Sequence, residues 1–236
     1  MQKERSVKGF GETVSVCLIL FAITLTIWLT AGNGEYLAWQ MLRHAPAEKT
    51  GLPEEEYSGM GRMVADYLIG KTDEFQYVYT DATGQSVTCF HDYEAAHMAD
   101  CRELLEKDLA AWIATGLTGM ITLAVVLISR RFFLNYFFRG MIIGLHIVMI
   151  VAVILALWAV INFEGFFVTF HWIAFSNDGW RLNPNTDMLI RLMPIDFFID
   201  LGVRGALPVL GVPVLLEAVA RIGLWKTTGS WVWDEI

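Results

Sequence analysis

The chain has 236 residues, of which 55% are hydrophobic, and its mean hydropathy is +0.47. This composition excludes an ordinary soluble globule and indicates an all-α membrane protein with a single membrane-embedded domain, residues 1–236. The 25 acidic residues outnumber the 17 Lys and Arg residues, and the net charge of −8 excludes a nucleic-acid partner on electrostatic grounds.

Four apolar runs are long enough to cross a bilayer, since a span needs about 20 mostly apolar residues. They cover about residues 14–31, 109–129, 140–161 and 203–224. The first run could alternatively be interpreted as a cleaved signal peptide. Its apolar part is longer than the usual run of about 7–15 residues, and Thr30-Ala31-Gly32 is a poor cleavage site, so we expect a retained span. The fourth run contains Glu217, which can pair with Arg221 one turn later.

The positive charges predict the orientation of these spans. Lys and Arg residues flank the spans at one end, at Lys3, Arg5, Lys8, Arg130, Arg131, Arg139 and Lys226. By the positive-inside rule both termini are cytoplasmic, and two segments, about 32–108 and 162–202, are extracellular. Residues 32–109 hold 15 acidic residues and 6 Lys or Arg residues. The first extracellular segment therefore accounts for the acidity of the whole chain.

The first extracellular segment reads as helices followed by a small β-hairpin. An amphipathic stretch over Glu35–Arg43 precedes a loop rich in Pro and Gly, and three glutamates at residues 54–56 open the next helix. Alternating aromatic residues in Phe75–Phe90, with a turn at Asp81-Ala82-Thr83-Gly84, predict the hairpin. An isolated hairpin is only marginally stable, so we expect it to pack on the neighbouring helices.

A helix is predicted to start near Asp92, which is a plausible N-cap, and to continue into the second span. With no breaker from Tyr93 to Ser129, the helix would be roughly 55 Å long at about 1.5 Å per residue. Glu94, His97 and Cys101 fall on one stripe of this helix, and Asp100 lies three residues after His97. A carboxylate beside an imidazole fixes its tautomer and raises its basicity, as a general base requires.

The second extracellular segment is rich in aromatic residues, which commonly gather at the level of the lipid headgroups. They are Phe163, Phe166, Phe167, Phe170, Trp172, Phe175 and Trp180. A turn at Asn183-Pro184-Asn185-Thr186 and a short helix over Asp187–Met193, stopped by Pro194, follow. His171 lies within the aromatic cluster.

The histidines divide into structural and chemical candidates. His44 lies in a polar loop and His146 lies within a span, so structural roles are expected, and His91 is expected to help cap a helix. His97 and His171 both lie just outside the membrane on the same side. Two groups that titrate near neutral pH at the edge of the hydrocarbon indicate acid–base chemistry on a lipid, although each could also be a hydrogen-bonded interfacial histidine.

Two other kinds of site use the same residues. His97 and Cys101 have metal-ligand spacing on a helix, and His171 or Glu94 could complete a zinc site. Alternatively, Cys101 or Cys89 could be a nucleophile with His97 as its base. A disulfide between these two cysteines is permitted outside the membrane, but nothing in the sequence demands one. No Gly-rich phosphate loop and no Gly-x-Ser-x-Gly elbow occurs.

Three short motifs resemble a known family in their order and placement. Glu94-Ala-Ala-His97-Met98-Ala-Asp100 is similar to the Glu-x-x-His-Met-x-Asp signature of bacterial lipoprotein intramolecular transacylases. Phe170-His171-Trp172-Ile-Ala-Phe175, with Trp180 downstream, resembles their Phe-His-x-x-Phe-Phe…Trp motif, and Asp187-Met-Leu-Ile-Arg191-Leu-Met-Pro194 resembles a later stretch. The layout of four spans and two external segments also matches. Cys101 departs from the family pattern, where a small aliphatic residue is expected.

The resemblance implies an acyltransferase that uses no cofactor and acts on diacylglyceryl-modified lipoproteins in membrane lipid. The sn-2 acyl chain of the S-diacylglyceryl cysteine would move to the α-amino group of that cysteine and leave a lyso-form lipoprotein. His97 and His171 would be the catalytic residues. The expected supporting or substrate-binding residues are Glu94, Asp100, Tyr93, Phe170, Trp180 and Arg191. His97 could be the base, and protonated His171, Tyr93 or Arg191 could donate to the oxyanion; the sequence leaves open which histidine is the base and which is the acid. The alternatives are a membrane hydrolase, perhaps zinc-dependent, and a non-catalytic membrane binding module.

Overall fold

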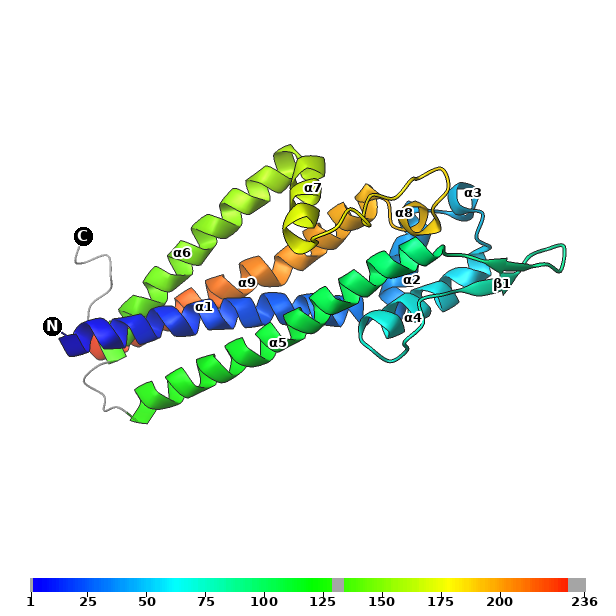
Figure 1. The fold of residues 1–236 in the computed structure, drawn as a ribbon. Coiled ribbons are helices and arrows are strands. Elements are labelled where there is room, and N and C mark those ends of the chain that lie inside the picture. The colour runs from blue at the N-terminus through cyan, green and yellow to red at the C-terminus, as the bar shows by residue number, and fades with distance from the viewer. Residues whose placement is uncertain (1, 129–133, 229–236) are drawn as a thin grey trace. The chain divides into compact units, whose positions relative to one another are not determined.

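The computed structural model describes residues 2–128 and 134–228 of the chain, and these residues are predominantly helical (Figure 1). In chain order the elements are α1 (Gln2–Ala31), α2 (Gly34–His44), α3 (Ala47–Thr50), the short 3-10 helix η1 (Glu54–Glu56), α4 (Tyr57–Leu68), β1 (Val78–Thr80), β2 (Ser86–Thr88), α5 (Asp92–Ile128), α6 (Leu134–Ile161), α7 (Phe163–Ala174), α8 (Met188–Leu192) and α9 (Ile195–Thr228). Within these ranges, four helices are long and apolar enough to cross a membrane: α1, α5, α6 and α9.

The helical membrane architecture predicted from the sequence is confirmed, with differences at the edges of elements. Helix α9 begins directly after Pro194, so the span continues into residues expected to be extracellular. The aromatic residues from Phe163 to Trp172 lie on a helix of their own, α7, which the sequence did not reveal, and Phe175 and Trp180 follow this helix. The side chain of Asn162 caps this helix by accepting a hydrogen bond from the Gly165 amide at 2.9 Å. His44 ends α2 rather than lying in a loop, and its Nε2 is 3.8 Å from Asp200 Oδ2.

The chain divides into two compact units, which are described separately. The span unit comprises residues 1–25, 110–161 and 205–236, and the site unit comprises residues 26–109 and 162–204. The expectation of one domain for the whole chain stays a prediction. Both predicted catalytic histidines belong to the site unit.

Small residues bring α1 and α6 close together in the span unit. A Cβ atom on Gly144 would lie 2.9 Å from the Glu12 carbonyl oxygen, so only glycine fits there. Next to this contact, the buried Ser15 hydroxyl donates to the Met141 carbonyl at 3.1 Å. Large apolar side chains of α6, such as Ile150 and Ile154, remain exposed. A lipid-facing helix surface has this character, because lipid tails are as apolar as the side chains themselves.

Three ionisable side chains form a network in the span unit. Arg221 Nε donates to Glu217 Oε1 at 2.9 Å, as the sequence predicted, and His146 Nε2 lies 3.3 Å from the same oxygen. Charged groups within spans are costly unless they are partnered, so this network explains how α9 tolerates them. It also supports the structural role expected for His146.

The site unit is built around a hydrophobic core to which α2, α4, α5, α8 and the start of α9 contribute. Helix α2 packs against α4, as Figure 1 also shows. The fully buried core side chains include Met41, Leu52, Tyr57, Met60 and Leu192. The Tyr57 hydroxyl donates to the Ala45 carbonyl and pairs with Thr50 Oγ1 at 2.7 Å. The predicted amphipathic segments therefore bury their apolar faces against one another.

The predicted hairpin is present and antiparallel, with Tyr79 opposite Val87. Asp81 Oδ1 accepts hydrogen bonds from the amides of Thr83 and Gln85, and Gly84 takes a positive φ of 82° that closes the turn. The Tyr77 hydroxyl donates to Glu56 Oε2 at 2.6 Å. The hairpin is thus attached to the helical segment before α4, as its weak intrinsic stability requires.

Candidate active site

The structure brings the two predicted catalytic histidines together. The ring centroids of His97, on α5, and His171, on α7, are 6.2 Å apart, and each residue is only 8% exposed. Both side chains belong to the site unit, so their separation is defined within one compact body. The two distant sequence segments therefore build one buried pair of imidazoles.

His171 is held by its own helix. Its Nδ1 lies 2.8 Å from the Phe167 carbonyl oxygen, four residues earlier on α7. A carbonyl oxygen only accepts hydrogen bonds, so Nδ1 carries the proton and donates. In the neutral imidazole the other nitrogen, Nε2, then bears a free lone pair. The local helix geometry thus fixes the tautomer of His171 without help from a carboxylate.

Aromatic rings surround His171. Centroid distances to its imidazole are 4.2 Å for Phe167, 5.0 Å for Trp180, 5.4 Å for Phe170 and 5.5 Å for Phe175. Burial among these rings lowers the pKa of His171, because desolvation disfavours the imidazolium, and the bond to Phe167 opposes this only in part. The residues Phe170 and Trp180, expected from the sequence to support the site, therefore contact a catalytic candidate directly.

His97 lies in an equally dry setting but has different partners. Its ring packs against Phe175 at 5.2 Å, and its Nε2 is 3.6 Å from Cys101 Sγ. Its Nδ1 is buried and, within the parts of the chain that the structure describes, has no hydrogen-bond partner. Burial lowers the pKa of His97 to about 4, repulsion from His171 adds to this, and Asp100 opposes it. His97 is therefore neutral at physiological pH.

Glu94 has a different role from the one expected. It is fully buried, and its two oxygens accept hydrogen bonds at 2.8 Å from the amides of His91 and Leu189. Glu94 thus caps the start of α5 and ties it to α8, whereas the sequence had placed the N-cap at Asp92. This carboxylate is already occupied by two backbone donors, so it does not orient His97.

Asp100 influences His97 through space. Its Oδ2 accepts a hydrogen bond from Asn177 Nδ2 at 2.9 Å, which links α5 to the loop after α7. Its negative charge raises the pKa of His97, but less than burial lowers it. Asp100 therefore raises the basicity of His97 as expected from the sequence, but burial has the larger effect and leaves the pKa of His97 below its ordinary value.

The two other predicted donors have partners of their own. The Tyr93 hydroxyl donates to Asp187 Oδ1 at 2.7 Å, and the bond to this carboxylate raises the pKa of Tyr93 to about 12. Arg191 places Nη2 3.9 Å from Met188 Sδ, and its Nε is buried without a partner among the described residues. Their roles as substrate or oxyanion donors stay predictions.

The cysteines do not have the properties of nucleophiles. All three are free, so Cys89 and Cys101 are not bonded to each other. Burial raises the pKa of Cys101 to about 12 and that of Cys89 to about 11, which keeps both as thiols. Across residues 2–128 and 134–228, no group of three or more His, Cys, Asp or Glu side chains is arranged to hold a metal ion. The described geometry therefore does not favour the zinc or cysteine hypothesis.

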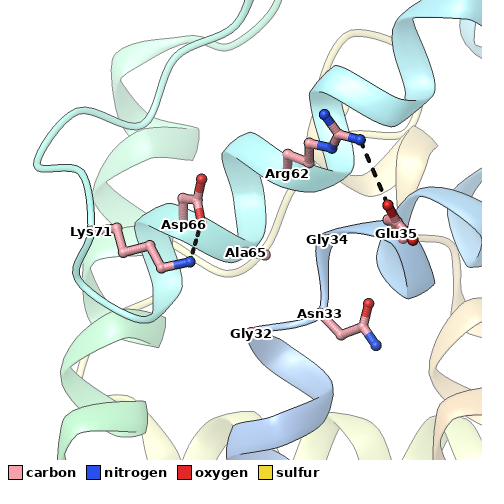
Figure 2. Close-up of a pocket in the computed structure, with 8 residues that line it drawn as sticks. All are labelled: Gly32, Asn33, Gly34, Glu35, Arg62, Ala65, Asp66 and Lys71. Carbon is pink, nitrogen blue, oxygen red and sulfur yellow. Dashed lines mark hydrogen bonds and ion pairs between the residues drawn. The ribbon is translucent and has the colours of Figure 1, made fainter.

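A polar surface pocket of about 460 Å³ also lies in the site unit, but it does not contain the histidines (Figure 2). The ion pairs Arg62–Glu35, at 3.6 Å, and Lys71–Asp66, at 3.0 Å, form part of its wall. The remaining lining residues are Gly32, Asn33, Gly34 and Ala65. The charges of this pocket are already paired, which sets it apart from the apolar surroundings of His97 and His171.

Some contributors to the site had no chemical signature in the sequence. The Phe167 carbonyl, which orients His171, is a backbone group, and only the helical i, i+4 spacing could have indicated it. Asn177 and Asp187 are polar loop residues that bind Asp100 and Tyr93 across 77 and 94 positions of sequence, respectively. Their partners depend on tertiary packing.

The fold and the sequence both match one family. The family model of the lipoprotein intramolecular transacylase Lit matches residues 13–198. The structure is similar to that of the membrane-integral lipoprotein intramolecular transacylase Lit from Bacillus cereus, with a TM-score of 0.72, 21% identity, and coverage of 97% of this chain and 99% of that one.

A variant of the Bacillus cereus protein in which a histidine is replaced by alanine gives a TM-score of 0.66 at 21% identity, with 97% of each chain covered. No curated protein sequence matches the chain. The family model covers most of the chain and the fold agrees. The chain is therefore a multi-pass membrane acyltransferase that belongs to the lipoprotein intramolecular transacylase (Lit) family.

Proposed function

We propose that the enzyme moves the sn-2 acyl chain of an S-diacylglyceryl cysteine to the α-amino group of that same cysteine, with His97 and His171 as the catalytic pair. The observation that carries this proposal is the buried pair of neutral imidazoles, 6.2 Å apart and enclosed by aromatic rings. The substrates would be diacylglyceryl-modified lipoproteins in membrane lipid, and no nucleic acid would be involved.

His171 is suited to act as the general base. Its Nδ1 proton is held by the Phe167 carbonyl, which leaves the Nε2 lone pair free to accept a proton from the substrate amine. A free α-amine titrates near pH 7.7–8, about one unit above neutrality, and is therefore largely protonated and unreactive in water. Burial among aromatic rings disfavours the ammonium form, so the site itself helps to supply the nucleophile.

His97 is suited to donate a hydrogen bond to the developing oxyanion. It is neutral because burial lowers its pKa to about 4, and its Nδ1 is buried without a partner in the described structure. A proton on that nitrogen would stabilise the negative oxygen of the tetrahedral intermediate. The roles are assigned in this order because the Phe167 carbonyl leaves a lone pair on His171 Nε2, whereas His97 has a buried nitrogen, Nδ1, without a partner in the described structure.

The proton and bond changes balance within one substrate molecule. The amine nitrogen attacks the ester carbonyl carbon, a C–N bond forms, and His171 takes the amine proton. The C–O bond to the glycerol sn-2 oxygen then breaks, and that oxygen receives a proton from the imidazolium. Since nucleophile and ester belong to one molecule, holding them in contact supplies much of the acceleration, and no acyl-enzyme is needed.

The distribution of positive charge supports a site on the extracytoplasmic side with both termini in the cytoplasm. The site unit contains both segments that the sequence assigns to the outside, including α2, α4 and α7. Exposed aromatic residues of α7, such as Phe170 and Trp172, would then lie at the level of the headgroups, where an acyl ester is found.

Purified protein and a synthetic diacylglyceryl lipopeptide provide the test. Tandem mass spectrometry should locate the transferred acyl chain on the cysteine nitrogen, and the total mass should not change. His97→Ala and His171→Ala should abolish this product, whereas the matched span-unit variant His146→Ala should retain it. A fully active His97→Ala/His171→Ala double variant would overturn the proposal. Release of free fatty acid would instead support a hydrolase, and an unchanged lipid a binding module.

A further inference from the structure

We propose that Cys101 is a positioning residue that fixes the tautomer of His97 by donating its thiol hydrogen to Nε2, in place of the usual carboxylate. The inference rests on the proposed function only where it concerns activity, because the tautomer can be measured without turnover.

The geometry of α5 brings the two groups together. Cys101 follows His97 by four residues, so both side chains lie on the same face of the helix. The distance from Cys101 Sγ to His97 Nε2 is 3.6 Å, which is a normal separation for a hydrogen bond that involves sulfur. It is the one hydrogen bond to this imidazole among the described residues, since Nδ1 has no partner there.

The state of the thiol permits the direction that we propose. Burial keeps Cys101 protonated, since its pKa is raised to about 12, so the sulfur carries a hydrogen to donate. His97 is neutral and has one nitrogen with a lone pair. When the thiol donates to Nε2, that lone pair is on Nε2 and the imidazole proton is on Nδ1.

The tautomer of His97 determines whether this residue can donate a hydrogen bond to the substrate oxyanion. A proton on Nδ1 makes the unpartnered, buried nitrogen a donor that is available to the substrate oxyanion. The other tautomer would place a lone pair there and would repel the same oxygen. Histidines that act in catalysis or bind metals are usually oriented by a carboxylate or a carbonyl, and His171 has a carbonyl of this kind at Phe167. For His97 that role falls to a thiol on its own helix.

Nuclear magnetic resonance with ¹⁵N-labelled histidine tests the tautomer directly. The protein is studied near pH 7.5, and the His97 signals are assigned by their loss in His97→Gln. The wild type should show the Nδ1–H tautomer at residue 97. Cys101→Ser, which retains a donor, should keep it, whereas Cys101→Ala should give a mixture of tautomers. Cys89→Ala is the matched control, because it removes another buried thiol of the same unit, and it should leave the spectrum unchanged.

Activity on the lipopeptide tests the role of the tautomer. One hydrogen bond of ordinary strength corresponds to roughly a tenfold effect, so Cys101→Ala should lower kcat about tenfold with little change in KM. Cys101→Ser should stay within about threefold of the wild type. The proposal is overturned if wild-type His97 carries its proton on Nε2, or if Cys101→Ala lowers kcat without altering the tautomer. A changed tautomer with unchanged kcat would exclude the positioning role.

Discussion

His146 of the span unit and the two catalytic candidates of the site unit differ in the partners that they have. In the span unit, His146 lies 3.3 Å from Glu217, which is itself bonded to Arg221, so each ionisable group is compensated by a neighbour. In the site unit, His97 and His171 are buried among aromatic rings, and no carboxylate forms an ion pair with either one in the described structure. A histidine that is paired with a carboxylate, like His146, has a structural role. An uncompensated neutral histidine keeps a nitrogen for a substrate, at a cost in stability.

The largest expected effect is on activity and separates the two kinds of histidine. Loss of a general base typically costs about 10²–10⁴ in rate and loss of an oxyanion donor about 10²–10³, so His171→Ala and His97→Ala should lower kcat by these respective ranges. His146→Ala should leave kcat within about threefold, because its loss removes only a span-unit contact. Initial rates of lipopeptide conversion provide the measurement. A decrease in kcat for His146→Ala as large as that for His171→Ala would contradict the distinction between the carboxylate-paired histidine and the two catalytic candidates.

Removal of the Glu94 carboxylate should have the next largest effect, on stability. Glu94→Ala leaves the buried amides of His91 and Leu189 without an acceptor, which should lower the free energy of unfolding by about 2–4 kcal/mol. Glu217→Ala in the span unit removes the shared carboxylate of Arg221 and His146 but leaves no buried amide without an acceptor, so it should destabilise the protein less than Glu94→Ala. Thermal unfolding in the same detergent compares the two. Asp92→Ala, an exposed carboxylate in the first turn of α5, is the control and should change little.

The neutral state of His97 predicts a pH dependence of stability. The pKa of His97 is about 4 in the folded protein, below its ordinary value of 6.5. Above pH 6.5 both states are neutral and full stability is present. Between pH 6.5 and 4 the unfolded chain binds a proton that the folded protein excludes. The free energy of unfolding should therefore decrease as the pH is lowered from 6.5 to 4, by on the order of 2–3 kcal/mol for this group.

The contribution of His97 can be isolated by difference. Other groups titrate in the same window, so the measurement is the difference in unfolding free energy between wild type and His97→Gln as pH changes. That difference should grow from pH 4 to 6.5 and then become constant. A difference that is flat across the range would show that the imidazole is as well solvated in the folded protein as in the unfolded chain.

The smallest expected effect concerns the aromatic surroundings of His171. Trp180→Ala should admit water, which raises the lowered pKa of His171 toward its ordinary value. A base must be unprotonated, so kcat/KM at pH 6 should fall by up to about fourfold, with little change at pH 8. The acidic limb of the pH–rate profile reports this shift. Trp172→Ala removes an exposed indole of α7 and should leave that limb in place.

The sequence was sufficient to predict the large elements and the identity of the histidine pair. The spans are long and apolar, and the hairpin has a turn with its own local chemistry, so both are predictable from neighbouring residues. Helix α7 was missed because aromatic residues lie almost all around it, which hides the helical period. The role of Glu94 was misassigned because its second partner, the Leu189 amide, is 95 positions away. Long-range backbone contacts of this kind have no pattern in a single sequence.

The hydrogen bond from Leu189 to Glu94 has a consequence for biosynthesis. When α5 leaves the ribosome, the acceptor at its first turn can meet only the nearby His91 amide, and the second donor is translated much later. The surroundings of His97 can form fully only after residues 188–192 have been translated, so an active enzyme requires translation at least through this segment. A polypeptide stopped before that segment would leave Glu94 with only one of its two backbone donors.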